Sequence, residues 1–262
     1  MNQFNRYSDG YKQAATYSNT SHKGSDKYSV LQTGAIIEMI KANSPYDVVS
    51  YHEGSTRKAS RNGQQVHLVK MRDTRISEIV DHTALVPEIV FLNSYDTTKA
   101  AKLFVGFLRG ACMNGLITGT ALESFSSRHI NFDYEALLNF IARVPDLVSH
   151  GLDQVKELQS KTLSDVAFKQ LALEVYKLKL GVAQDKAISR ADHVIETEVN
   201  RLLRHRRSAD TGTDAFTRLN IVQENILRGR RRGYGTLRAV NSIDKQVKIN
   251  RFLWDRTLEL AA

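Results

Sequence analysis

The residues best suited to chemistry are arginines grouped in one short stretch near the end of the chain. Residues 228–238 read Arg-Gly-Arg-Arg-Arg-Gly-Tyr-Gly-Thr-Leu-Arg, with five arginines, three glycines and one tyrosine in eleven residues. Arginine makes paired, charge-assisted hydrogen bonds to phosphate, and a tyrosine ring can stack on a base. This Arg-Gly segment (residues 228–238) therefore predicts contact with a nucleic-acid backbone. The alternative is a solvated basic loop, or one that pairs with an acidic patch on another subunit.

Positive charge is concentrated in the same region. From residue 201 onward the chain has 14 Lys and Arg against 6 Asp and Glu, whereas the whole chain has a net charge of +9. Such localisation is typical of a polyanion partner, most often nucleic acid. Arginines near a helix end also suit its dipole, so those at 201–207 have a structural alternative. The predicted contacts are Arg228, Arg230, Arg231, Arg232, Tyr234 and Arg238, extended by Arg204, Arg206, Arg207, Lys245 and Lys248.

A second basic group lies in a predicted β-hairpin. Residues 46–52 are rich in β-branched and aromatic residues, residues 66–71 alternate as a return strand would, and Asn62-Gly63 between them is a tight-turn signal. The basic residues of the hairpin tip, which would contact a DNA strand, are Arg57, Lys58 and Arg61. The alternative is a solvated tip, because charged loop tips are common on monomers.

The sequence predicts neither an enzyme nor a cofactor. The eight histidines never form the His-x-x-x-His or His-Glu-x-x-His spacing of zinc sites, so no metal site is expected. Cys112 is the only cysteine, and a buried structural thiol is the ordinary role of such a residue. The Arg-Gly segment is not a Walker A motif, because no Gly-Lys-Ser/Thr follows it. A nuclease with an unrecognised site is the enzymatic alternative.

Composition indicates a globular protein that does not enter a membrane. Hydrophobic residues make up 42% and charged residues 25% of the chain, both ordinary values. No apolar run approaches the roughly 18 residues that a membrane span needs. The N-terminus lacks a signal pattern, so the expected location is the cytoplasm.

The hydrophobic patterns predict an α+β fold: an N-terminal helix, an antiparallel β-hairpin or sheet, and a C-terminal half with long helices. Residues 1–29 are polar and lack an apolar period, so they predict a flexible tail. Residues 30–132 are the β-rich part and residues 133–262 the helical part. We expect these two parts to form one continuous domain.

In the β-rich part, apolar spacing predicts a helix over 31–43, and 87–93 reads as a third strand. Residues 100–108 suit a buried strand or a helix; the glycines around them favour strands broken near Asn114-Gly115. Residues 124–132 suit a further strand or an edge.

In the helical part, a first helix is expected to stop at Pro145, and proline-free residues 148–205 predict one or two long helices with a break at Gly181. Further helices are expected over 216–227 and 243–260. The predicted caps of the helix over 216–227 are Thr213 or Asp214 at its start and Gly229, in the left-handed conformation, at its end.

Two groups of phrases carry a family resemblance, which spans roughly residues 30–260. The first group is Leu92-Asn93-Ser94-Tyr95-Asp96, residues 106–116 and Arg128-His129, and the second is residues 220–229, Arg238 and residues 250–254. They resemble a plasmid- and phage-like protein family known only as a domain of unknown function. The resemblance implies a mobile-element origin and supplies no catalytic residues. The order of elements is also similar to phage single-strand annealing proteins, which form rings or filaments, although fold similarity alone does not establish function.

The hypothesis that joins these observations is a phage or plasmid protein that binds single-stranded DNA, as a homo-oligomer, and promotes annealing in recombination or replication. The alternative is an interaction protein that inhibits a host defence complex, with its basic surface docked on an acidic partner.

Overall fold

The computed structural model describes residues 27–53, 64–73, 75, 78–80, 83–109, 115–116, 124–208, 210–229, 238–240 and 242–262. Within these residues it is the predicted α+β fold. The chain divides into two compact units. The first, here the sheet unit, comprises Met1–Val80, Ala84–Gly110 and Leu122–Ser149. The second, the helical unit, comprises Asp81–Thr83, Ala111–Ala121 and His150–Ala262.

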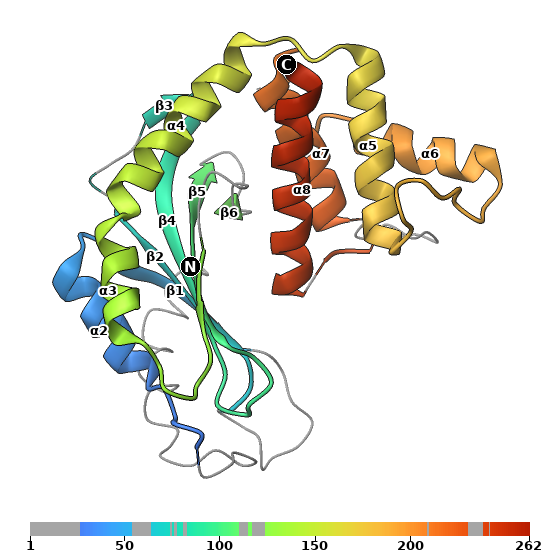
Figure 1. Cartoon of the computed structure of the whole chain (residues 1–262). Coiled ribbons are helices and arrows are strands. Elements are labelled where there is room, and N and C mark those ends of the chain that lie inside the picture. The colour runs from blue at the N-terminus through green and yellow to red at the C-terminus, as the bar shows by residue number, and fades with distance from the viewer. Residues whose placement is uncertain are drawn as a thin grey trace, which may run out of the picture. The chain divides into compact units, whose positions relative to one another are not determined.

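The sheet unit is built on an antiparallel sheet (Figure 1). Its strands are β1 (Asp47–Glu53), β2 (His67–Arg72), β3 (Glu78–Val80), β4 (Thr83–Asn93), β5 (Ala101–Arg109) and β7 (Ser124–Ser127). They pair in the order β1-β2-β4-β5, with β7 on β5 and β3 on β4. The predicted hairpin is confirmed, and its register runs from Asp47 opposite Arg72 to Glu53 opposite His67.

Three predicted strands are confirmed with altered bounds. The ambiguous run over 100–108 is the strand β5, and the strand predicted over 87–93 begins at Thr83. The strand predicted within 124–132 ends at Ser127. A further short strand, β6 (Gly115–Leu116), follows Asn114 in the sequence. Strand β3 was not predicted, because three residues are too few to show an alternating pattern.

One face of the sheet is closed by large apolar side chains. Alternate residues of β2, β4 and β5 share this face and are fully buried: Met71, Ile89, Phe91, Leu103 and Phe107. Helix α2 (Thr33–Asn43) contributes the equally buried Ile36, Ile37 and Ile40. Figure 1 shows α2 and α3 (Tyr134–Ala142) on the same side of the sheet. Each such side chain stabilises the fold by roughly 1.5–3 kcal/mol.

The other face of the sheet carries a buried charge. Glu88 on β4 is only 2% exposed, and Arg72, directly opposite it on β2, donates to its carboxylate at 2.7 Å. Lys70 on the same strand forms a second ion pair with Glu88 at 3.2 Å. The cations compensate the charge that burial would otherwise penalise. This cross-strand group therefore helps fix the register between β2 and β4.

The start of α2 is held by a buried polar network rather than by a side-chain cap. The hydroxyl of Tyr95 accepts a hydrogen bond from the Thr33 backbone N–H at 2.9 Å. His67 Nδ1 lies 3.0 Å from the carbonyl of Gln65, which can only accept, so Nδ1 carries the proton. His67 Nε2 therefore accepts from the Thr33 hydroxyl at 2.6 Å, and the Asn93 amide donates to that hydroxyl at 3.0 Å. The network is satisfied with a neutral imidazole.

The helical unit contains helices that the sequence did not separate. The described helices of the C-terminal half are α4 (Val144–Ser160), α5 (Asp165–Leu180), α6 (Asp192–Leu202), α7 (Ala215–Arg228) and α8 (Ile243–Ala261). The prediction that a helix stops at Pro145 is wrong: α3 ends at Ala142, and Pro145 lies in the first turn of α4. Proline is tolerated there because its missing N–H would have no partner within the helix.

The prediction of one or two long helices over 148–205 is also wrong, because that stretch contains most of α4 and all of α5 and α6. Ser164 separates the first two by accepting a hydrogen bond from the Ala167 N–H at 3.2 Å, as an N-cap does. Gly181 ends α5 with φ 74°, so the predicted break at this glycine is confirmed. Serine is a favoured N-cap, so Ser164 was a signal for this boundary that apolar spacing alone did not show.

The boundaries of α7 follow its capping residues. Asp214 is the N-cap, and its side chain accepts from the Thr217 N–H at 2.8 Å, which confirms one of the two predicted caps. Gly229 follows the helix with φ 61° and ψ −156°. The φ is positive as predicted, but the ψ value shows that the predicted left-handed helical conformation is wrong. Glycine suits this conformation because it has no Cβ.

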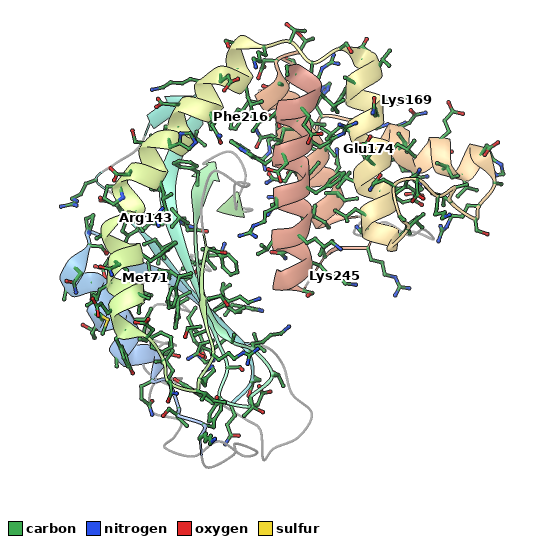
Figure 2. The ribbon with its side chains drawn as sticks, in the orientation of Figure 1. Met71, Arg143, Lys169, Glu174, Phe216 and Lys245 are labelled. Atoms are coloured by element: carbon green, nitrogen blue, oxygen red, sulfur yellow. The ribbon has the colours of Figure 1, made fainter. Side chains whose placement is uncertain are left out.

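Helix α7 is the centre of the helical unit. Its residues from Ala215 to Leu227 are all buried, and it contacts α5, α6 and α8. Helix α8, predicted over 243–260, buries Trp254, whose indole N–H donates to Gln154 at 3.0 Å. Figure 2 marks Glu174 on α5, which accepts a two-pronged hydrogen bond from Arg256 of α8 at 2.7 and 3.0 Å.

The His67 network makes the sheet unit sensitive to acid. Burial lowers the pKa of His67 to about 4; a hydrogen bond to Gln65 opposes the shift, and His129, whose pKa burial also lowers, adds to it. The unfolded chain takes up a proton near the ordinary pKa of 6.5, whereas the folded chain does so near 4. Stability should therefore fall as the pH drops through this window, by about 3 kcal/mol for His67 alone.

Urea unfolding followed by circular dichroism at pH 7 and pH 4.5 measures this loss. His67→Gln should lose less stability between the two pH values than the wild type. The exposed His52 provides the matched control, and His52→Gln should retain the full loss. Equal losses in the wild type and His67→Gln would contradict the assignment.

Candidate functional site

The C-terminal end of α7 fastens the turn that follows α6. The side-chain amide of Asn225 donates to the carbonyls of Leu202 at 3.0 Å and Arg204 at 2.8 Å. Its oxygen accepts from Arg206 Nε at 2.6 Å, and the same guanidinium donates to the carbonyl of Gly229 at 3.0 Å. Asn225 and Arg206 therefore tie the turn that follows α6 to the start of the Arg-Gly segment.

Glu224, one residue earlier, binds two further arginines. Its carboxylate is 2% exposed and accepts from Arg207 Nε at 3.2 Å and Nη2 at 3.0 Å. Arg228 forms an ion pair with it at 2.7 Å. Burial alone would raise the pKa of Glu224, but the hydrogen bonds of Arg207 and the charges of Arg207, Arg228 and Arg206 lower it below its usual range. Arg206, Arg207 and Arg228, predicted as nucleic-acid contacts, thus all have structural partners.

The two ends of the Arg-Gly segment meet on α5. The Val240 N–H donates to the carbonyl of Leu227 at 2.8 Å. Lys179, in the last turn of α5, donates to the carbonyls of Ile226 at 2.7 Å and Arg238 at 2.6 Å. The described residues at the two ends of the segment are therefore held side by side, which we call the closed base, as expected for a segment held by its flanking helices.

A pocket of about 460 Å³ opens at this base. Its walls come from the end of α5, the chain before α8 and the first turns of α8. Cationic residues dominate its polar lining: Lys179, Arg238, Lys245 and Lys248. Among the described residues that line it, none is acidic. We call it the basic pocket.

The cations of the basic pocket differ in exposure. Arg238, Lys245 and Lys248 are exposed, and the structure records no ion pair for their side chains with another described residue. Figure 2 shows Lys245 at the start of α8. Lys179 is half-buried, and this burial lowers its pKa to about 8, although the charge of Glu198 opposes the shift. The pocket therefore combines exposed surface cations with one cation anchored at its wall.

The rest of the lining suits an amphipathic ligand. Aliphatic side chains of Leu178, Val240 and Ile249 lie beside the cations. Ser242, the N-cap of α8, makes no capping hydrogen bond through its side chain, so the hydroxyl stays available. The start of α8 adds a partial positive charge. The arrangement can hold an anion that carries an apolar group.

The structure brings together part of the predicted site. Arg238, Lys245 and Lys248 share the basic pocket, while Arg204 is exposed in the turn held by Asn225. Predicted contacts outside the described residues are Arg230, Arg231, Arg232, Tyr234, Arg57, Lys58 and Arg61; Cys112 also lies outside them. Sequence reasoning missed Lys179 because a lysine in the last turn of a helix is a common dipole partner. Its place just before the predicted break at Gly181 was the available signal.

The described part of the chain shows neither a metal-binding cluster nor a membrane-spanning helix. It holds no cluster of three or more His, Cys, Asp or Glu side chains placed to bind a metal ion. Within the same residues no helix combines the length and the apolar character that crossing a membrane requires.

Comparison with known proteins matches the chain to a family whose function is unknown. A family model described as "Domain of unknown function (DUF932)" matches residues 22–254. The chain is similar to UPF0380 protein YafZ of Escherichia coli (strain K12), with 27% identity over 251 residues that cover 92% of this chain and 85% of that protein. It is also similar to UPF0380 protein YfjQ of the same strain, with 26% identity over 247 residues and the same coverage. No solved structure matches.

These matches confirm the predicted resemblance to a family known only as a domain of unknown function. The phage or plasmid origin and the similarity to annealing proteins stay predictions.

Glu224 should be essential to the stability of the site. Glu224→Gln removes the charge while keeping the shape, and it leaves Arg207 and Arg228 without their ionic partner. We expect a loss of about 2–3 kcal/mol, below the roughly 3–5 kcal/mol of a fully buried pair because both arginines regain water. Trp254, the only tryptophan, reports urea unfolding of the helical unit by fluorescence.

Glu196→Gln is the matched control for this variant. Glu196 forms an exposed ion pair with Lys169 at 3.8 Å, so its loss should cost less than about 1 kcal/mol. Comparable costs for the two variants would argue against a structural role for Glu224.

Proposed function

We propose that this chain, which belongs to the DUF932 family of unknown function, binds nucleic acid through the basic pocket and the Arg-Gly segment, with single-stranded DNA as the preferred partner. The observation that carries the proposal is the basic pocket itself: four cations and no described acidic residue at the closed base of an arginine-rich segment.

Electrostatics favours a polyanion here. Like charges gathered in one pocket repel one another, and this repulsion is relieved when anions bind. The buried carboxylate of Glu224 already compensates two arginines near the start of the Arg-Gly segment, Arg207 and Arg228. The exposed cations have no such compensation among the described residues. The arginines paired with Glu224 therefore stabilise the fold, whereas the exposed cations of the pocket are available to phosphates.

The preference for single strands rests on composition. Tyr234 lies among Arg230, Arg231 and Arg232 in the Arg-Gly segment, and stacking on an aromatic ring requires an unpaired base. Annealing activity and a homo-oligomer follow from the similarity to annealing proteins, and both are part of this proposal. Light scattering with and without DNA tests the oligomer; a monomer in both conditions would remove the annealing role.

Binding to a labelled single strand should depend on salt and on the pocket lysines. Four phosphate contacts predict a slope of about −3 for log affinity against log salt concentration. Lys245→Ala combined with Lys248→Ala should reduce the steepness by about 1.4 and weaken binding about tenfold at physiological salt. Fluorescence anisotropy over a salt series measures both quantities.

The matched control is Lys161→Ala combined with Lys169→Ala. It removes the same charge, and its lysines lie near the N-terminal end of α5, where they pair with Glu157 and Glu196. Figure 2 shows Lys169 and Lys245 at opposite ends of the helical unit. A flat salt response, or equal losses in the two double variants, would overturn the proposal. Binding to acidic polypeptides but not to DNA would favour the protein-partner alternative.

A further inference from the structure

We propose that the basic pocket is a binding site for a phosphate monoester, either the phosphorylated end of a strand or a free nucleotide. The inference rests on the proposed function, because it names the phosphate that the pocket takes from a bound strand. It adds to the proposed backbone binding a preference of the pocket for a terminal phosphate, which carries more negative charge than a backbone phosphate.

Size and lining suit a small group, such as the terminal nucleotide of a strand or a free nucleotide. A volume of about 460 Å³ lies within the range of roughly 300–1,000 Å³ found for small-molecule sites. Such sites pair apolar walls with a few polar groups that fix the orientation. Here Leu178, Val240 and Ile249 supply the apolar wall, which suits a sugar or base, while the cations suit the phosphate.

Charge matching favours a monoester over a backbone diester. A phosphodiester carries one negative charge, whereas a phosphate monoester carries about −1.5 to −2 at pH 7 and presents three acceptor oxygens. Lys179, Arg238, Lys245 and Lys248 line one pocket, so a single diester would leave most of their charge uncompensated. A dianion with three oxygens can contact several of these cations at once.

The donor count at Lys179 points the same way. An ammonium group has three N–H donors. Two of those of Lys179 go to the carbonyls of Ile226 and Arg238, and the third has no acceptor among the described residues. Because Lys179 lines the pocket, this third donor is available to a bound phosphate oxygen. The carbonyl contacts hold the ammonium in place before the ligand arrives, so little freedom is lost on binding.

The protonation state of Lys179 should make the affinity for a monoester depend on pH. The charged groups around Lys179 are Glu198 on α6, Arg238 on the adjoining chain, and Lys245 and Lys248 on α8. Burial lowers the pKa of Lys179 to about 8, with Glu198 opposing. Deprotonation above this value removes a positive charge and the third N–H donor. Monoester affinity should therefore be higher at pH 7 than at pH 9.

The test compares one oligonucleotide sequence with a 5′-phosphate, a 3′-phosphate or hydroxyl ends, by fluorescence anisotropy on the full chain. We expect at least one phosphorylated form to bind about tenfold more tightly than the hydroxyl form. Lys245→Gln and Lys179→Gln should each abolish this difference, and Lys169→Gln should preserve it. The difference should also shrink from pH 7 to pH 9 in the wild type. Because Lys179 contacts backbone carbonyls, Lys245→Gln is the variant that leaves the base intact.

A second arm separates the two sources of the monoester. Adenosine 5′-monophosphate and inorganic phosphate are titrated by calorimetry, with chloride at matched ionic strength as the blank. Binding of the nucleotide that Lys245→Gln abolishes supports the inference even if strands do not bind, in which case the proposed function fails alone. Salt-dependent strand binding that ignores terminal phosphates, with no nucleotide or phosphate binding, overturns the inference and leaves the proposed function standing.

Discussion

Burial of α7 on all sides is the constraint from which the rest of the helical unit follows. A helix with no solvent-facing side is usually apolar throughout, yet α7 carries several buried polar residues: Arg218, Asn220, Gln223, Glu224 and Asn225. Each must find a partner or destabilise the fold. Arg218 reaches Asp165 at the start of α5, and Gln223 donates to Asn250 on α8. The polar residues of one helix thus determine where its neighbours lie.

The same constraint explains how many arginines can lie together at one end of the unit. Glu224 and Asn225 hold Arg206, Arg207 and Arg228 through hydrogen bonds and charge, so these arginines strengthen the fold instead of repelling one another. The cations of the basic pocket lie outside this arrangement. Under the proposed function, fold stability and ligand binding depend on different members of one basic cluster, which a count of charges in the sequence cannot separate.

Features that depend on neighbouring residues could be predicted from the sequence. Contacts between residues that lie far apart in the chain could not. The hairpin, the Asp214 cap and the break at Gly181 each depend on neighbouring residues, and all three were predicted. Pro145 was misread because proline occurs both after a helix and in its first turn.

The site itself required the fold. Lys179 lies far from Arg238 and Lys245 in the chain, and packing of α5 against α8 brings them to one pocket. The structural role of Arg207 was equally hidden, because its partner Glu224 is 17 residues away.

Because both ends of the Arg-Gly segment are fixed, its length can change during evolution at little cost to stability. The Leu227–Val240 hydrogen bond and the two contacts of Lys179 fix both ends of the loop on the helices, whatever lies between them. Lengthening a loop whose ends are already fixed is inexpensive, since each doubling of length costs only about 0.6 kcal/mol. Relatives can therefore lengthen, shorten or recompose the stretch between Gly229 and Arg238 without disturbing α7. The composition of this stretch can therefore change while the helices that hold its ends stay the same.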